Sequence, residues 1–481
     1  MYFLFRKRLS FLFTFNIKNG KIRVQVTVLK LIEVESMFNK DFIFGCATAA
    51  SQIEGAYLDD GKVPSIWDKF CEKENAIIDG SDIKIACNSY YKYKEDISLL
   101  KELGVKSYRF SINWCRIINE NNEINYKGIE YYKNLAKECL NNGITPCATL
   151  YHWDMPQYIF EKGGLLNDDF SDWFSFYVDV FTKNLSDLIK DYITINEPQV
   201  IIFLGHRIGN HAPGLSLSNK EILLAIHNLL KAHGKAVKII RKNVNNSTIG
   251  IAPCSRGVVP VNNNNELYNK CKEYYFSLRN DYEFPNLISI YSDPVFLGDY
   301  PNEYYEMFKD ILPNITKEDL ELINQPIDYC YQNVYSGDYY DLIDDKLTKL
   351  PFPYGYPEGN INWLQVVPES LYYIPKFLYE RYHHPIIISE NGICCHDSIS
   401  LDGKVHDPNR IDFIHRYLNE LEKASNEVDI RGYYYWSLLD NFEWAEGYSK
   451  RFGLIYVDFK TLKRTKKDSF YEYQKIIKEV K

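Results

Sequence analysis

Two glutamates stand at the ends of uncharged, β-branched runs, where they could carry out acid–base chemistry. Glu390 follows three consecutive isoleucines and a serine, and Asn391 and Gly392 supply turn residues after it. Glu197 ends a similar run, and Pro198, which cannot continue a strand ladder, comes next. Hydrolysis of a glycosidic bond requires two carboxyl groups at one site, one as acid and the other as nucleophile or base.

Strands and helices must alternate along the chain to bring these glutamates together. Uncharged β-branched runs predict strands at residues 42–48, 107–113, 145–153, 192–197, 249–253, 328–335, 386–390 and 430–438. Apolar residues at helical spacing predict helices at residues 83–103, 126–142, 170–189, 222–242, 368–382, 410–424 and 468–478. Gly104 and Gly143 are expected to end the first two helices. Residues 262–326 loosen this alternation, and we expect a helix with long loops there.

Eight strand–helix units predict a parallel sheet of the α/β class. The chain has no glycine-rich phosphate fingerprint, which favours a closed barrel over a doubly wound sheet. The predicted fold is therefore a single (β/α)8 TIM barrel with long βα loops. Glu197 and Glu390 follow the fourth and seventh predicted strands. They would lie at the carboxyl end of the barrel, where such folds hold their active sites.

Composition excludes several classes of function. The net charge of -8 over 481 residues offers no general attraction for a phosphate backbone or an anionic membrane, so we expect neither nucleic acid nor a membrane as partner. No apolar run approaches about 20 residues. The eleven cysteines are scattered and form no zinc-like pair of C-x-x-C motifs, which indicates reduced thiols in the cytoplasm and no metal site.

Residues 1–36 precede the predicted barrel. They carry a basic cluster and a short apolar run, but no small-residue cleavage site follows, so the match to a signal peptide is poor. Met37 stands directly before the organised part of the chain. We interpret residues 1–36 as a leader or extension and residues 37–481 as the catalytic domain. A secreted or lysosomal location is the alternative to the cytoplasm if residues 1–36 act as a signal.

Seven short motifs occur in a fixed order along the chain. They are FIFGCATAASQIEG (42–55), YRFS (108–111), YHW (151–153), TINEP (194–198), NVY (333–335), ISENG (388–392) and WSLLDNFEW (436–444). Together they resemble the signatures of glycoside hydrolase family 1, the β-glucosidase family, from about residue 37 to the end. The resemblance implies a retaining β-glycosidase. It would hydrolyse terminal non-reducing β-D-glucosyl residues, and also β-galactosyl or β-fucosyl residues, by double displacement.

The resemblance also implies a role for each glutamate. Glu197 would be the acid/base and Glu390 the nucleophile. Glu197 must start protonated, so we expect its pKa to be raised by burial and, above all, by the charge of Glu390. Arg109 is expected to keep Glu390 ionised, and Asn333 to orient one of the two carboxyl groups.

Further residues of these motifs are implied in binding the substrate, a β-glucoside or an oligosaccharide. The hydrogen-bonding ring and stacking platform for the non-reducing sugar would consist of Gln52, His152, Asn196, Glu443 and Trp436. Contacts are also implied for Tyr335, Trp444 and Trp153, with a supporting role in the pocket wall as the alternative for Trp153. We expect no cofactor. The loops between strands that would hold the leaving group, and the oligomeric state, give no prediction.

Two other functions compete with β-glucoside hydrolysis. A phosphate-binding branch of the family cleaves 6-phospho-β-glycosides and usually has serine at the position of Glu443, whose charge would repel a phosphate. Relatives without activity have lost one carboxylate, and this chain keeps both Glu197 and Glu390. A thioglucosidase branch replaces the acid/base with glutamine, which Glu197 excludes.

Overall fold

The computed structural model describes residues 9–18, 21–31 and 38–480, with side chains from residue 38 onward. Eight parallel strands close into a barrel in the order β12-β13-β3-β4-β5-β6-β7-β9, so the predicted (β/α)8 fold is confirmed. In chain order these strands are β3 (Ile43–Ala47), β4 (Ser107–Ser111), β5 (Thr145–Tyr151), β6 (Asp191–Asn196), β7 (Thr248–Ala252), β9 (Tyr329–Asn333), β12 (Ile386–Asn391) and β13 (Ile430–Trp436).

The barrel strands are buried on both faces, as the sequence pattern predicts. Every residue of β12 is buried, because its isoleucines face both the barrel interior and the surrounding helices. The strand pairs in parallel with β9 on one side and β13 on the other, and Glu390 lies opposite Asn333 in this register. Strand register thus places a functional side chain of β12 beside one of β9.

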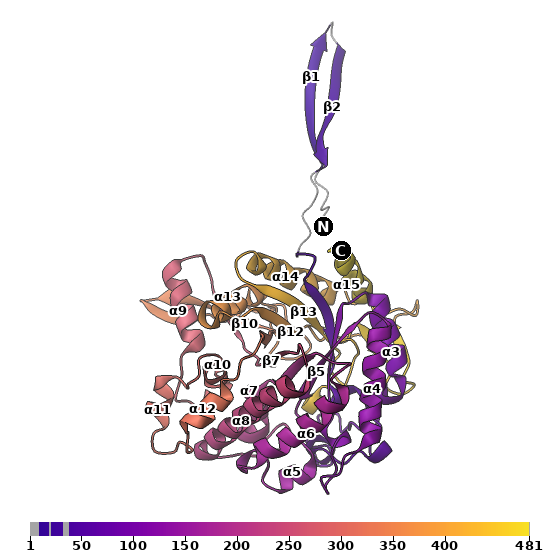
Figure 1. The fold of residues 1–481 in the computed structure, drawn as a ribbon. Coiled ribbons are helices and arrows are strands. Elements are labelled where there is room, and N and C mark those ends of the chain that lie inside the picture. The colour runs from indigo at the N-terminus through magenta and orange to yellow at the C-terminus, as the bar shows by residue number, and fades with distance from the viewer. Residues whose placement is uncertain (1–8, 19–20, 32–37, 481) are drawn as a thin grey trace.

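Fifteen α-helices occur in the described part of the chain, and those around the barrel form its outer layer (Figure 1). They are α1 (Ala50–Ile53), α2 (Ile66–Phe70), α3 (Ser89–Leu103), α4 (Tyr126–Asn141), α5 (Gln157–Glu161), α6 (Phe170–Leu185), α7 (Pro198–Ile202), α8 (Asn219–Asn243), α9 (Asn265–Phe276), α10 (Ile288–Phe296), α11 (Asn302–Phe308), α12 (Lys317–Ile323), α13 (Ser370–Tyr382), α14 (Pro408–Ser425) and α15 (Asp468–Glu479).

The first long helix, α3, ends where the sequence pattern predicts but begins later than predicted. Gly104 has a φ of 87° and ends α3, as predicted for a residue in the left-handed region. The helix begins at Ser89 and not at residue 83, because Ala86 and Asn88 have φ values of 49° and 55° that no α-helix accommodates. Ile85, which lies inside the predicted helix, is instead exposed in the preceding loop.

Long βα loops build additional structure on the barrel. The insertion expected at residues 262–326 contains α9, α10, α11 and α12. A small sheet, which the sequence analysis missed, combines β8 (Gly257–Pro260), β10 (Gly337–Ile343) and β11 (Lys346–Lys349). A short hairpin, also missed, pairs β14 (Ile455–Val457) with β15 (Arg464–Lys466).

The N-terminal region forms a hairpin of its own. β1 (Leu9–Lys18) pairs antiparallel with β2 (Lys21–Leu31), and the two strands make a separate sheet above the barrel in Figure 1. The rest of the predicted leader, residues 1–8, 19–20 and 32–36, lies outside the described residues. Within the described part of the chain, every helix is too short or too polar to cross a membrane.

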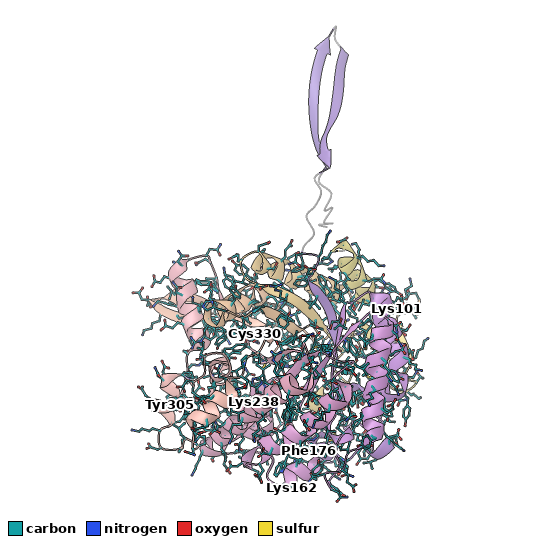
Figure 2. All side chains as sticks on the ribbon, viewed as in Figure 1. Lys101, Lys162, Phe176, Lys238, Tyr305 and Cys330 are labelled. Atoms are coloured by element: carbon teal, nitrogen blue, oxygen red, sulfur yellow. The ribbon has the colours of Figure 1, made fainter. Side chains whose placement is uncertain are left out.

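Side chains fill the body of the barrel (Figure 2). The labelled Cys330 of β9 lies in the interior of the view and is fully buried, whereas Lys101 and Lys162 lie toward its edge. The polar groups described below are therefore held in a closely packed interior.

Candidate active site

Glu390 lies near the carboxyl end of β12 and is bound by two donors. Arg109, from β4, donates from Nη1 to Glu390 Oε1 at 2.6 Å. Tyr335, just beyond β9, donates its hydroxyl to Glu390 Oε2 at 2.7 Å. Both carboxylate oxygens are thus fixed in direction, as a nucleophile requires.

Burial and charge act in opposite directions on Glu390. Burial raises the pKa of Glu390, and the Arg109 guanidinium and the Tyr335 hydroxyl oppose this rise. Arg109 is 1% exposed and donates further to the Ser389 carbonyl and to Thr149 Oγ1. A buried arginine cannot lose its proton, so it stabilises the ionised form of its carboxylate partner.

Glu197 occupies a strained turn between β6 and α7. Its φ and ψ are 46° and 64°, in the left-handed region, and Pro198 begins the helix directly after it. The backbone N–H of Glu197 donates to the Ala252 carbonyl at 2.7 Å, which ties this turn to β7. Asn333 Nδ2 donates to Glu197 Oε1 at 2.9 Å. The turn aims the carboxyl group inward.

The pKa of Glu197 is raised to about 8, first by burial and second by the charge of Glu390. The direction matches the sequence-based expectation, but the order of causes does not, since the charge was expected to dominate. Loss of hydration inside the barrel disfavours a charged carboxyl whether or not a second one is present. At neutral pH Glu197 is therefore mostly protonated and able to act as an acid.

A hydrogen-bond network joins the two glutamates to the residues around them. Asn196 Oδ1 accepts from Arg109 Nη2 at 2.6 Å and from Asn333 Nδ2 at 3.1 Å. These two donors define the orientation of the Asn196 amide, so its Nδ2 faces His152 Nε2 at 3.0 Å. Burial, and next the Arg109 charge, lower the pKa of His152 well below its ordinary value. His152 is therefore neutral, accepts at Nε2 and carries its proton on Nδ1.

Three buried polar atoms around this network have no hydrogen-bond partner among the described residues. They are Gln52 Oε1, His152 Nδ1 and Glu443 Oε2. The Gln52 amide is itself held in place, since Nε2 donates to Asn441 Oδ1 and to the Phe442 carbonyl. Buried polar atoms are normally paired, so two acceptors and one donor suit a ligand rich in hydroxyl groups. The pKa of Glu443 is raised to about 8, chiefly by burial.

Aromatic rings line the same region. The rings of His152 and Trp436 stack with centroids 6.0 Å apart, and Trp444 stacks on His152 at 6.1 Å. Trp153 packs on Trp444 at 4.5 Å and donates its indole N–H to the Asn196 carbonyl. Because its indole N–H is already bound to protein, Trp153 is better suited to support the pocket wall than to bind the substrate. All twelve residues predicted for the site therefore lie in one connected group at the carboxyl ends of the barrel strands.

The geometry, two buried carboxyl groups among hydroxyl-matching polar atoms and aromatic rings, agrees with comparison to known proteins. The sequence profile of glycosyl hydrolase family 1 matches residues 34–481. The chain belongs to glycosyl hydrolase family 1. It is accordingly an O-glycosyl hydrolase.

Family 1 relatives cover nearly the whole chain. β-Glucosidase A of Thermotoga maritima is 41% identical over 450 residues, 92% of this chain and 98% of that protein. β-Glucosidase A of Acetivibrio thermocellus is 42% identical over 456 residues, again with 92% and 98% coverage. A solved structure of the Thermotoga maritima β-glucosidase in complex with glucoimidazole has a TM-score of 0.84 and 39% identity, covering 92% of this chain and 99% of that one.

Sequence reasoning overlooked three residues at this family 1 site. Asn441 orients Gln52, although its motif was recognised. Trp363, 42% exposed, meets Tyr335 edge-on with centroids 5.7 Å apart. Cys254 forms a parallel bridge with Asn333, whose side chain binds Glu197. Cys254 follows a predicted strand directly, so the rule that active-site residues follow barrel strands would have indicated it.

Proposed function

We propose that this family 1 enzyme hydrolyses terminal non-reducing β-D-glucosyl residues with retention of anomeric configuration. One observation carries the proposal: two buried carboxyl groups at the same end of the barrel have different partners. Glu390 is held by a cation and a hydroxyl, whereas Glu197 is held by a neutral amide and has a pKa of about 8. Such different surroundings allow one carboxyl group to be an ionised nucleophile while the other is a protonated acid.

The relatives support a glucosyl substrate. Two relatives from bacteria carry the name β-glucosidase A, and the solved glucoimidazole complex is of a β-glucosidase from Thermotoga maritima. In this chain the unpaired atoms of Gln52, His152 and Glu443 supply two acceptors and one donor for sugar hydroxyls. The Trp436 indole supplies a surface for the C–H face of the ring.

In the first step, Glu390 attacks the anomeric carbon while Glu197 gives its proton to the leaving oxygen. The glycosyl–oxygen bond breaks, and a covalent glycosyl ester of Glu390 forms. Arg109 and Tyr335 hold the attacking carboxylate in one orientation throughout. Asn333 holds the carboxyl group of Glu197 through its Oε1.

In the second step, the roles of Glu197 reverse. Ester formation removes the charge of Glu390, which is one of the two causes that raise the pKa of Glu197. Glu197 then accepts a proton from water, and the resulting hydroxide attacks the anomeric carbon from the face that the leaving group vacated. The bond between the anomeric carbon and Glu390 breaks, and Glu390 leaves as a carboxylate. Two inversions give overall retention.

We assign β-fucosides and β-galactosides as further substrates and exclude 6-phospho-β-glucosides. Glu443 offers a carboxyl group with a free oxygen, which can bind a hydroxyl but provides no positive charge for a phosphate. Hydrolysis rates for the nitrophenyl β-glucoside, β-galactoside, β-fucoside and 6-phospho-β-glucoside test this assignment. Turnover of the 6-phosphoglucoside above the glucoside would contradict it.

We also propose that the enzyme works in the cytoplasm. All eleven cysteines are free, including the adjacent Cys394 and Cys395. Free thiols persist in reducing compartments, whereas secreted proteins tend to oxidise theirs. Fractionation of cells that make the full chain with a C-terminal tag tests this, and recovery in the medium would favour the alternative that residues 1–36 act as a signal.

Chemical rescue tests the two catalytic roles. Glu390→Gly should abolish turnover, and added azide, entering the vacated face, should give the α-glucosyl azide. Glu197→Ala should still form the glycosyl ester from a nitrophenyl glucoside, because that leaving group needs little protonation. Azide needs no base, so it should restore turnover and give the β-glucosyl azide. Exchanged products would reverse the two roles. For retention, we expect the carboxyl groups about 5–5.5 Å apart and a β-configured first product by NMR.

A further inference from the structure

Trp363 presents a partly exposed indole beside the residues that hold the nucleophile. Its ring meets that of Tyr335 edge-on with centroids 5.7 Å apart, and the Tyr335 hydroxyl donates to Glu390 Oε2. Trp363 is 42% exposed, whereas Gln52 and His152, whose unpaired atoms suit hydroxyl groups of the terminal sugar, are 0% and 3% exposed. The terminal sugar is thus enclosed, and its leaving group must extend toward solvent. Trp363 lies on that exposed side.

Trp363 belongs to a short loop that folds back on itself between β11 and α13. Residues 358–365, the Trp363 loop, are closed by an antiparallel bridge between Glu358 and Gln365. Inside the loop, the Gly359 N–H donates to the Leu364 carbonyl at 2.8 Å, and Leu364 is fully buried. The loop is thus bonded internally, and its contacts with other elements fix the position of the indole.

Arg256, which directly precedes β8, binds this loop on one side of its guanidinium. Nη1 donates to the Trp363 carbonyl at 2.6 Å, and Nη2 donates to Gln365 Oε1 at 2.7 Å. The guanidinium also donates to both carboxylate oxygens of Asp338 in β10, from Nε at 2.8 Å and from Nη2 at 2.9 Å. Nη2 donates further to the Gly337 carbonyl at 3.1 Å. A planar guanidinium with five donors can hold several partners in one fixed geometry, which a single ammonium group cannot.

These bonds join the Trp363 loop to the chain just beyond Tyr335. Asp338 lies three residues after Tyr335, and its side chain is only 8% exposed. Between the two, the Ser336 hydroxyl donates to the Gln365 carbonyl at 2.8 Å. Arg256 therefore links the loop that carries one aromatic ring to the strand that follows the other. The small sheet of β8, β10 and β11 serves as the anchor for this link.

We propose that Arg256 is a positioning residue for the leaving group: by fixing the Trp363 loop, it holds the indole against the group that departs when the β-glucoside is cleaved. The proposal rests on the β-glucosidase function proposed above. An indole packs well on the C–H face of a sugar ring, so the leaving group that this arrangement suits is a second sugar. Arg256 acts through Trp363 and takes no part in the reaction itself.

Selectivity between two substrates tests the proposal, measured as the ratio of kcat/KM for cellobiose to kcat/KM for β-D-glucosyl fluoride. Fluoride leaves as a single ion and offers no surface to Trp363. Arg256→Met should lower kcat/KM for cellobiose by about 3- to 10-fold, the size of one aromatic contact, and leave kcat/KM for the fluoride unchanged. Lys349 keeps a cation 3.0 Å from Asp338 in this variant, so the variant should fold.

A second variant and a control separate positioning from general damage. Trp363→Ala should lower the selectivity ratio at least as much as Arg256→Met. Adding Arg256→Met to Trp363→Ala should change the ratio no further, because the group through which Arg256 acts is already gone. Arg241→Met is the matched control: Arg241 pairs with Asp328 away from the Trp363 loop and, like Arg256, has 36% of its side chain exposed. Its ratio should equal that of the wild type.

The contrary outcomes are distinct from one another. An equal loss of kcat/KM for both substrates in Arg256→Met would overturn the positioning role, and so would an unchanged ratio or additive losses in the double variant. Wild-type turnover of the fluoride without turnover of cellobiose would overturn the assignment of a sugar as leaving group. The proposed function itself would fail in another way, since the wild-type enzyme would then hydrolyse neither substrate.

Discussion

At the residue scale, Glu197 and Glu390 differ through the atoms that touch them. Arg109 offers Glu390 a permanent positive charge, whereas Asn333 offers Glu197 only an amide. Both carboxyl groups are buried, and burial raises the pKa of each. The cation opposes that rise at Glu390, which leaves Glu390 ionised under conditions in which Glu197 keeps its proton.

We predict a bell-shaped dependence of kcat/KM on pH. Glu197 must be protonated, so activity should fall as pH rises through about 8. Glu390 must be ionised, and its pKa is raised above the ordinary glutamate value, so activity should fall on the acid side at a pH above that value. Steady-state kinetics with nitrophenyl β-D-glucoside between pH 4 and 10 measure both limbs. An alkaline limb near pH 5 would contradict the assignment of Glu197 as acid.

Replacement of Arg109, the cation beside Glu390, should slow the chemical step more than it weakens substrate binding. We expect Arg109→Met to lower kcat/KM by about 100- to 1000-fold, since a preorganised charge at the reacting group is lost. The acid limb should also move to higher pH, because Glu390 would keep its proton longer. Arg416→Met removes an exposed arginine paired with Asp412 and serves as control, with unchanged kinetics. Equal effects of both replacements would contradict a specific role for Arg109.

At the element scale, the ends of the barrel strands and the turns after them aim the functional groups. Glu197, Trp153 and Trp444 all have positive φ values, 46°, 72° and 51°. Such conformations are unfavourable for residues with a Cβ atom and persist only where surrounding contacts enforce them. The site therefore depends on turns that the packed barrel holds in place.

The N-terminal hairpin should be dispensable for this arrangement. β1 pairs with β2 and with no strand of the barrel in the described residues, whereas β3 pairs with both β4 and β13. A chain that starts at Met37 should therefore remain active, with an unchanged thermal midpoint by circular dichroism. A chain that starts at Ala50 lacks β3 and cannot close the barrel, so it should not fold. Loss of soluble protein from the Met37 variant would contradict our interpretation of residues 1–36.

At the scale of the whole molecule, a buried ionic cluster joins loops far apart in the sequence. Lys467 donates to Asp397 at 2.5 Å and to Asp440 at 2.6 Å, and all three side chains are at most 2% exposed. Arg410 binds Asp397, and Arg451 binds Asp440. Asp440 directly precedes Asn441, which orients Gln52, so the cluster also fixes the chain next to a residue of the candidate site.

We predict that Lys467→Met lowers the free energy of unfolding by about 3–5 kcal/mol, since two buried carboxylates lose their shared cation. Lys475→Met is the matched control: Lys475 pairs with Glu472 at the surface, with 62% of its side chain exposed. Its removal should change stability by less than about 0.5 kcal/mol. Urea denaturation followed by tryptophan fluorescence measures both. Equal stability of the two variants would show that the cluster contributes little.

Much of this architecture could be predicted from the sequence because it depends on local pattern. Runs of isoleucine between helical periods predict buried parallel strands, and parallel strands that close a barrel bring their carboxyl ends together. That rule alone placed Glu197 and Glu390 at one site, although they are far apart in the chain. The motifs around them supplied the family resemblance and the remaining site residues.

Tertiary structure decided the features that depend on contacts between distant residues. Arg109 and Glu390 are 281 residues apart, and no local pattern states which oxygen accepts or whether burial outweighs charge at Glu197. The small sheet of β8, β10 and β11 escaped prediction because β8 has only four residues and pairs with β10 across a long stretch of chain. Cys254 looked like one of eleven scattered thiols, and only the fold placed it beside Asn333, which binds the Glu197 carboxyl. Local sequence sets which elements form, whereas packing sets which side chains meet and how far burial shifts their protonation.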